Sequence, residues 1–135
     1  MKLFCSYAFT GENLQSVTDR MRLVVDQLNE AGHDAYCPLF DAHKDEMQAN
    51  NDIKGIFSYA FRRIHENEGV VAIITSDRRS EGQLMEIGAA LSQNKPVYLF
   101  VHDSAKDAPS HLRVLATQAF TWADDRELKR ALSTL

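Results

Sequence analysis

The side chain best placed for chemistry is Glu86, in the segment from residue 75 to residue 90. This segment leaves a strongly apolar run, passes through polar residues and enters a stretch with helical spacing. Ser80, with Gln83 three residues later, has the form of a capping box, which predicts that a helix begins at Ser80. Glu86 would then lie near the helix start, where the helix dipole helps to keep a carboxylate ionised. A carboxylate in this position can face a ligand.

The same predicted helix carries two glycines and an apolar stripe. Gly82 and Gly88 have no side chains, so a ligand or another backbone can approach closely on either side. The stripe expected to face a sheet consists of Leu84, Ile87 and Leu91. Glu86 lies about 100° of helical turn from Ile87, at the margin of this stripe.

Strands and helices are expected to alternate along the chain. Short apolar runs predict strands at residues 3–7, 35–39, 70–74, 96–101 and 119–122. Helical spacing predicts helices that start near residues 14, 53, 80, 112 and 125. The polar segment 41–51 shows no clear periodicity and is predicted to be a long loop, hence a candidate functional loop. We expect one α/β domain over residues 1–135, with a Rossmann- or flavodoxin-like, doubly wound, mostly parallel sheet of about five strands.

In a sheet of this class, ligands bind beyond the carboxyl ends of the strands, near the point where the strand order switches. Three segments follow predicted strands at that edge, namely residues 7–13, 39–51 and 75–86. The sequence therefore places its candidate site where these three segments meet.

Composition excludes several classes of protein. The formal net charge of −4, with no basic stripe, argues against a dedicated nucleic-acid-binding module. No apolar run is long enough to span a bilayer, and the N-terminus lacks the pattern of a signal peptide. Cys5 and Cys37, both within apolar runs, are expected to be reduced thiols, as is usual in a cytoplasmic protein.

The motif around Glu86 resembles the signature of the nucleoside 2-deoxyribosyltransferase superfamily, which includes the 2-deoxynucleoside 5-monophosphate N-hydrolases. The resemblance is carried by Ser80-x-Gly82-x-x-x-Glu86-Ile87-Gly88-x-Ala90, followed by Lys95-Pro96-Val97. The opening Leu3-Phe4-Cys5-Ser6-Tyr7, then Gly11 and a long helix, is similar to that family's first strand and sugar-binding loop. The order of the elements matches over most of the chain.

This resemblance implies a reaction and a set of roles. Glu86 would be the nucleophile that attacks the anomeric carbon, forming a glycosyl-enzyme ester that water or a second base resolves. Tyr7 would orient Glu86, and Asp77 or Asp41 would stand in as the proton donor. The substrate-binding residues implied are Ser6, Gly11, Asp41, Ser80 and Gly82, with Ser80 near a helix start that can also receive a phosphate.

The chain departs from the family pattern at two positions. The family's aspartate before the third strand is replaced by Gly69, and the first-loop arginine of the monophosphate hydrolases is replaced by Phe9. No cofactor is implied, and Asp41, His43, Asp45 and Glu46 lack the spacing of metal ligands.

Two other readings stay open. Phe4-Cys5-Ser6-Tyr7 with a helix glutamate is also compatible with a TIR-like domain that cleaves NAD at its nicotinamide bond. A non-catalytic nucleotide-binding module on the same scaffold is the third hypothesis. In the resembling family, neighbouring subunits complete each other's sites, so we expect a homodimer or higher homo-oligomer, with Phe120 or Trp122 as packing residues.

Overall fold

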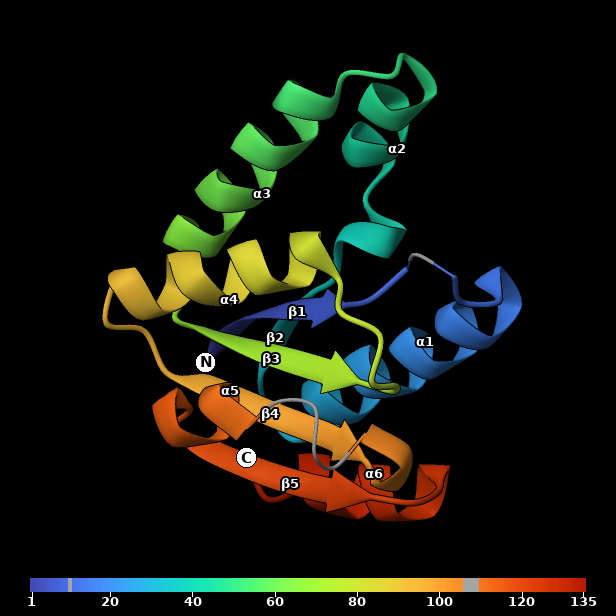
Figure 1. The fold of residues 1–135 in the computed structure, drawn as a ribbon, viewed down its shortest axis with the longest axis vertical. Coiled ribbons are helices and arrows are strands. Elements are labelled where there is room, and N and C mark those ends of the chain that lie inside the picture. Colours follow the sequence, from blue (N-terminus) through green and yellow to red (C-terminus); the bar gives the residue numbers. More distant parts are fainter. Residues whose placement is uncertain (10, 106–109) are drawn as a thin grey trace.

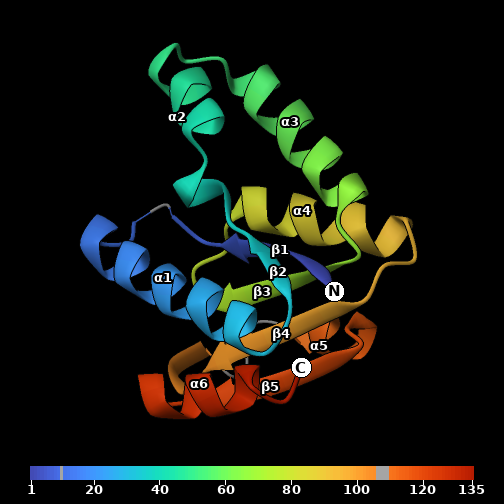
Figure 2. The same ribbon diagram turned by 180° about the vertical axis from the view of Figure 1, so that it is seen from behind.

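The computed structural model describes residues 1–9, 11–105 and 110–135, which form one parallel sheet covered on both faces by helices (Figures 1 and 2). The five strands run in the order β2-β1-β3-β4-β5, and every neighbouring pair is parallel. Their bounds are Lys2–Tyr7 (β1), Asp34–Tyr36 (β2), Gly69–Ile74 (β3), Val97–His102 (β4) and Gln118–Trp122 (β5). This confirms the predicted doubly wound, flavodoxin-like α/β fold.

The central strands are apolar because both of their faces are covered. All six residues of β3 are buried, and successive residues point to opposite layers. Val71 and Ile73 join one core beneath the helices α1 (Leu14–Glu30) and α6 (Asp125–Leu132). Val70 and Ala72 join the other core, beneath α3 (Ile53–Glu66), α4 (Glu81–Ser92) and the short α5 (Ser110–Leu115).

Segment 41–51, predicted to be a loop, contains a helix. After β2 the chain makes a 3-10 turn, η1 (Pro38–Phe40), which ends the strand at Tyr36 and not at residue 39 as expected. Helix α2 (Ala42–Ala49) follows, capped by Asp41, whose side chain accepts a hydrogen bond from the backbone N–H of His43. Helix α2 buries no residue, so it carries no apolar stripe that periodicity could reveal.

The buried stripe of α4 also differs from the expected one. Its buried residues are Gln83, Ile87 and Ala90, whereas Leu84 is 40% exposed. Gln83 is tolerated in the interior because its amide Nε2 donates to the backbone oxygen of Ile73, 2.9 Å away. This hydrogen bond ties the first turn of α4 to the end of β3.

Both cysteines are free and buried, as expected. None of the helices in the described part of the chain is long and apolar enough to cross a membrane.

Lys95, in the connection from α4 to β4, holds the end of α3. Its ammonium Nζ donates to the backbone oxygens of Ile64, His65 and Asn67 at 2.5–2.6 Å. The last carbonyls of a helix have no partner within the helix, so a side chain that satisfies several of them stabilises the helix end. Since α3 packs against α4, Lys95 also helps to fix the wall of the site.

Replacing Lys95 with Met should therefore lower the free energy of unfolding by about 1–3 kcal/mol, because these carbonyls lose a charged donor. Chemical denaturation of Lys95→Met beside the wild-type protein measures this change. Lys129→Met, on the exposed face of α6, is the matched control and should change stability by less than about 0.5 kcal/mol. Equal stabilities of the two variants would contradict the capping role.

Candidate active site

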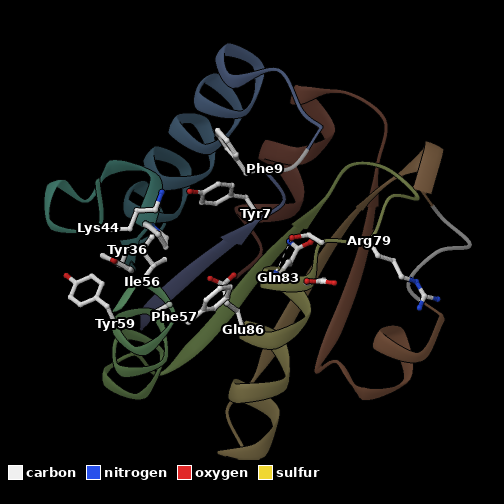
Figure 3. A pocket seen from close by; sticks show the side chains of 15 residues that line it. Tyr7, Phe9, Tyr36, Lys44, Ile56, Phe57, Tyr59, Arg79, Gln83 and Glu86 are labelled. Carbon is white, nitrogen blue, oxygen red and sulfur yellow. Dashed lines mark hydrogen bonds between the residues drawn. The ribbon is translucent and has the colours of Figure 1, made fainter. Parts of the chain in front are cut away.

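A cavity of about 560 Å³ opens at the carboxyl end of β1, between the start of α4 and the pair α2 and α3 (Figure 3). Glu86 lines it from α4 and Tyr7 from β1, while Lys44 lines it from α2 and Tyr59 from α3. The cavity thus lies where the three segments predicted to follow strand ends meet, namely residues 7–13, 39–51 and 75–86. It is found at the edge of the sheet where doubly wound folds bind ligands.

Glu86 is half-buried in the second turn of α4, and one of its carboxylate oxygens is held from the sheet. The hydroxyl of Ser6, a fully buried residue of β1, donates to Glu86 Oε1 at 2.7 Å. The strand places Ser6 at this point, because Ser6 is the last fully buried residue before β1 ends at Tyr7. The hydrogen bond fixes the carboxylate at the cavity wall.

Burial raises the pKa of Glu86 to about 7, although the hydrogen bond from Ser6 and the positive charge of Lys44 oppose this rise. The expected help of the helix dipole in keeping this group ionised stays a prediction, because the largest effect at Glu86 is the loss of solvation, which favours the neutral form. A carboxyl group that titrates near neutrality can exchange between an acid and a nucleophilic base.

Tyr7 lines the same cavity but does not hold Glu86. The hydrogen bond to Glu86 comes from Ser6, where the sequence analysis had expected the hydroxyl of Tyr7. In Figure 3 the ring of Tyr7 lies on the side of the cavity where Lys44 enters. Burial raises the pKa of Tyr7 well above its usual value, with smaller contributions from nearby negative groups that include Glu86. Tyr7 therefore keeps its proton at neutral pH.

Ser80 and Gly82 lie beside Glu86 in the cavity wall. The Ser80 hydroxyl accepts a hydrogen bond from the backbone N–H of Gln83, so Ser80 is the N-cap of α4 as predicted. A Cβ added at Gly82 would meet the ring of Phe57 at 3.8 Å, an ordinary contact. Gly82 is therefore not required by packing, and its role in binding stays a prediction.

Three other candidate residues lie apart from Glu86. Asp77 lines a second cavity of about 190 Å³, which shares Ser80 and Gln83 with the first. Gly11 has a φ of +76°, and its Cα is covered by the side chain of Arg78. Asp41 stands behind the cavity wall, with Oδ2 accepting hydrogen bonds from two tyrosine hydroxyls.

Gly69 and Phe9, the two departures from the family pattern, differ in their position relative to the cavity. Gly69 begins β3, at the amino end of the strand and so at the edge opposite the cavity, where its Cα packs against Pro96. It therefore has no bearing on a proton donor at the site. Phe9, by contrast, lines the cavity and is 43% exposed.

Several cavity residues were missed by sequence reasoning. Lys44, Tyr36 and Tyr59 carry no motif. The long polar segment 41–51 was a signal for Lys44 alone, since both tyrosines lie outside it. Arg79 borders both cavities, and in Figure 3 its guanidinium points away from Glu86. Across residues 1–9, 11–105 and 110–135, no three His, Cys, Asp or Glu side chains are grouped to hold a metal ion.

The pKa of Glu86 has a consequence for stability. Between its usual pKa of 4.5 and about 7, the folded protein binds more protons than the unfolded chain, so stability falls as pH rises through this range. Glu86→Gln removes the titration but keeps an oxygen that can accept from Ser6. Its stability relative to wild type should thus increase by about 2 kcal/mol between about pH 5 and about pH 8. Urea denaturation at both pH values measures it, and a constant difference would contradict the raised pKa.

Ser6→Ala removes the donor that favours the charged form of Glu86. The pKa of Glu86 should then rise further, by about one unit, because a hydrogen bond to a charged group contributes about 1.5–3 kcal/mol. Carbon-13 NMR of the glutamate carboxyl resonances across pH measures the shift. Ser92→Ala is the control, since the Ser92 hydroxyl donates to the Ala89 carbonyl oxygen on the far part of α4. A Glu86 pKa unchanged by Ser6→Ala would mean that this hydrogen bond does not form in solution.

Comparison with solved structures finds the same fold. The CMP N-glycosidase BcmB of Clostridium botulinum superposes with a TM-score of 0.73 at 15% identity, covering 99% of this chain and 98% of that one. A 2-deoxyribosyltransferase from Bacillus psychrosaccharolyticus gives a TM-score of 0.69 at 18% identity, covering 98% and 96%. At these identities the likeness concerns the fold alone.

Comparison of sequences finds no match among curated proteins. The sequence pattern of one family, described as nucleoside 2-deoxyribosyltransferase, matches residues 4–122. This range contains all the cavity residues discussed above and most of the chain. The chain therefore belongs to the nucleoside 2-deoxyribosyltransferase family.

Proposed function

We propose that this protein cleaves or transfers the N-glycosidic bond of a nucleoside or nucleotide through a covalent glycosyl-Glu86 intermediate. The observation that carries the proposal is the Glu86 carboxyl group, held by Ser6 in the wall of a cavity large enough for a small ligand. The family to which the chain belongs supports the same reaction class. The two structural neighbours, a CMP N-glycosidase and a 2-deoxyribosyltransferase, are consistent with it.

The proposed reaction has two steps. The ionised Glu86 carboxylate attacks the anomeric carbon, the bond from that carbon to the base nitrogen breaks, and the base leaves with the bonding electron pair and takes up a proton. Water, or a second base, then attacks the same carbon and releases Glu86 as a carboxylate, as in retaining glycosidases. Ser6 occupies Oε1 of Glu86, which leaves the other oxygen for the attack.

We propose that the leaving-group proton comes from a group that lines the cavity. The Tyr7 hydroxyl and the Lys44 ammonium belong to residues that line this cavity, whereas Asp77 lines the second cavity. We infer that Asp77 reaches the base only if the substrate extends past Ser80. Ser80 and Gly82, at the start of α4, are proposed to contact the sugar or an attached anion, since free backbone N–H groups at a helix start favour negative charge. From the resemblance, Gly11 is proposed to contact the sugar. For Ser6 we propose support of Glu86 in place of a direct contact with the substrate.

We further propose that residues 1–135 form one domain that works in the cytoplasm as a homodimer or higher oligomer. Trp122 is buried in the core and cannot supply the exposed aromatic surface considered from the sequence. Exposed apolar side chains are instead found on α3 and α4, among them Phe61, Leu84 and Met85, each more than a third exposed. Exposed apolar groups of this kind are frequent at subunit contacts.

Glu86→Gln should abolish release of free base, lowering the rate by at least about a thousand-fold, because the amide cannot form the glycosyl ester. The test incubates the purified protein with mixed nucleosides and their monophosphates and follows free base by chromatography. Glu30→Gln, the same substitution at the exposed end of α1, should keep full activity.

The same incubation separates the alternatives. NAD is included, and nicotinamide release from NAD alone would favour the TIR-like reaction over the proposed one. If no substrate is cleaved but a nucleotide raises the melting temperature, the chain is a nucleotide-binding module and the enzymatic proposal fails.

A further inference from the structure

Helix α2 has an unusual relation to the rest of the fold. It contributes Lys44 to the cavity wall, yet it buries none of its own residues. In both Figure 1 and Figure 2 it lies beside the first turns of α3, away from the sheet. Because α2 has no buried apolar face of its own, its position depends on its contacts with α3 and with the turn that precedes it.

The contact at the start of α2 is made by Asp41. Its Oδ1 accepts from the backbone N–H of His43 at 3.0 Å, which caps the helix. Its Oδ2 accepts from the hydroxyl of Tyr36 at 2.6 Å and from that of Tyr59 at 2.8 Å. Although burial would raise the pKa of Asp41, these hydroxyls and the backbone N–H groups hold it below its ordinary value. One carboxylate thus joins α2, the end of β2 and α3.

The two tyrosines are themselves fixed from the body of the protein. The Tyr36 ring packs against Phe4 of β1, with ring centroids 5.6 Å apart. The Arg63 guanidinium of α3 lies 4.0 Å from the centroid of the same ring. The Tyr59 ring packs against the His43 ring of α2 in a T-shaped arrangement, with the two ring centroids 4.9 Å apart. The chain of contacts therefore runs from the sheet, through Tyr36 and Asp41, into the first turn of α2.

Lys44 is the third residue of α2 and so belongs to this capped first turn. Its Nζ donates to Gln48 Oε1, 2.8 Å away on the next turn of α2, so the ammonium moves together with the helix. In Figure 3 it enters the cavity from the side of Tyr7. Anything that displaces the start of α2 will displace this charge relative to Glu86.

We propose that Asp41 is a positioning residue, which by capping α2 and accepting both tyrosine hydroxyls fixes Lys44 in the cavity wall shared with Glu86. The proposal rests on the proposed function in one respect, namely that Glu86 is the reacting group. It replaces the role in substrate binding first predicted for Asp41, because Asp41 supports the cavity through Tyr36 and Tyr59, which line it.

The charged and titratable groups around Glu86 set the sign of the expected effect. Besides Lys44, they are Tyr7 from β1, Tyr36 from β2, Cys37 after β2, Tyr59 from α3, and Arg79 and Glu81 at the start of α4. Lys44 lowers the pKa of Glu86, so moving it away raises that pKa. Removing the negative charge of Asp41 would, by direct Coulombic action alone, lower the pKa of Glu86. The two explanations therefore predict opposite shifts.

The test measures the pKa of Glu86 by carbon-13 NMR in the full chain, with Glu86→Gln identifying the resonance. Asp41→Asn should raise the pKa by roughly half a unit, and Lys44→Met should raise it by the same amount. The double variant should show no further rise, since Lys44 acts only where Asp41 has placed it. Asp52→Asn is the matched control, because Asp52 caps α3 by accepting from Gly55 and has no tyrosine partner among its hydrogen bonds.

A lowered or unchanged Glu86 pKa in Asp41→Asn would overturn the proposal, and so would shifts that add in the double variant. If Asp41→Asn does not fold, Tyr59→Phe removes one of the two hydroxyl donors and leaves the cap in place. It should then give a smaller shift in the same direction, and no shift would again overturn the proposal. Because the readout is a titration, it remains valid if no base release is found, and the two proposals can fail separately.

Discussion

The hydrogen bond from Ser6 to Glu86 is the interaction on which the site depends. It joins the end of β1 to the second turn of α4 across 80 residues of sequence, with Ser6 fully buried and Glu86 half-buried. A carboxyl group placed there loses solvation, which is why its pKa moves towards neutrality. The donor from the sheet opposes this rise, because a hydrogen bond to the charged form of a carboxyl group favours that form.

Three contacts fix the rotation of α4 that this hydrogen bond requires. Ser80 starts α4 at a defined residue, and the amide of Gln83 fastens the first turn to the end of β3. Ile87 then anchors the helix in the core between α4 and the sheet. With these three contacts set, the rotation of α4 brings Glu86 to the boundary between core and cavity. A helix rotated by one residue would bury the carboxylate fully or expose it.

Most of the scaffold could be predicted from the sequence because it follows from burial. The apolar run of β3 and the capping box at Ser80 are local signals, and each led to the correct element. Helix α2 could not be predicted because it has no buried face, and its start depends on a single cap at Asp41. Leu84 was assigned to the buried stripe because hydropathy cannot show that Gln83 has a buried hydrogen-bond partner.

The site could be predicted only in part, for a related reason. Glu86 and Ser80 belong to one local motif, so their spacing was readable in the sequence. Ser6, which donates to Glu86, and Lys44, which lines the same cavity, belong to other elements, and nothing in their local sequence indicates that they lie near Glu86. Tyr7 was expected to be the partner of Glu86 because it ends the first strand. Successive residues of a strand point to opposite faces, so Ser6 and Tyr7 cannot both point towards Glu86.

The two sides of the cavity next to Glu86 differ in how deeply their residues are buried. The side formed by β1 and α4 is built from buried residues and holds the carboxylate in one place. The opposite side, formed by α2, is attached mainly through polar contacts and carries the cation that opposes protonation of Glu86. The pKa of the Glu86 carboxyl group therefore depends both on the buried side and on the position of Lys44, which lies outside the core. In this fold, changes at Asp41 or in α2 can therefore alter the chemistry of the site while the five-stranded sheet stays unchanged.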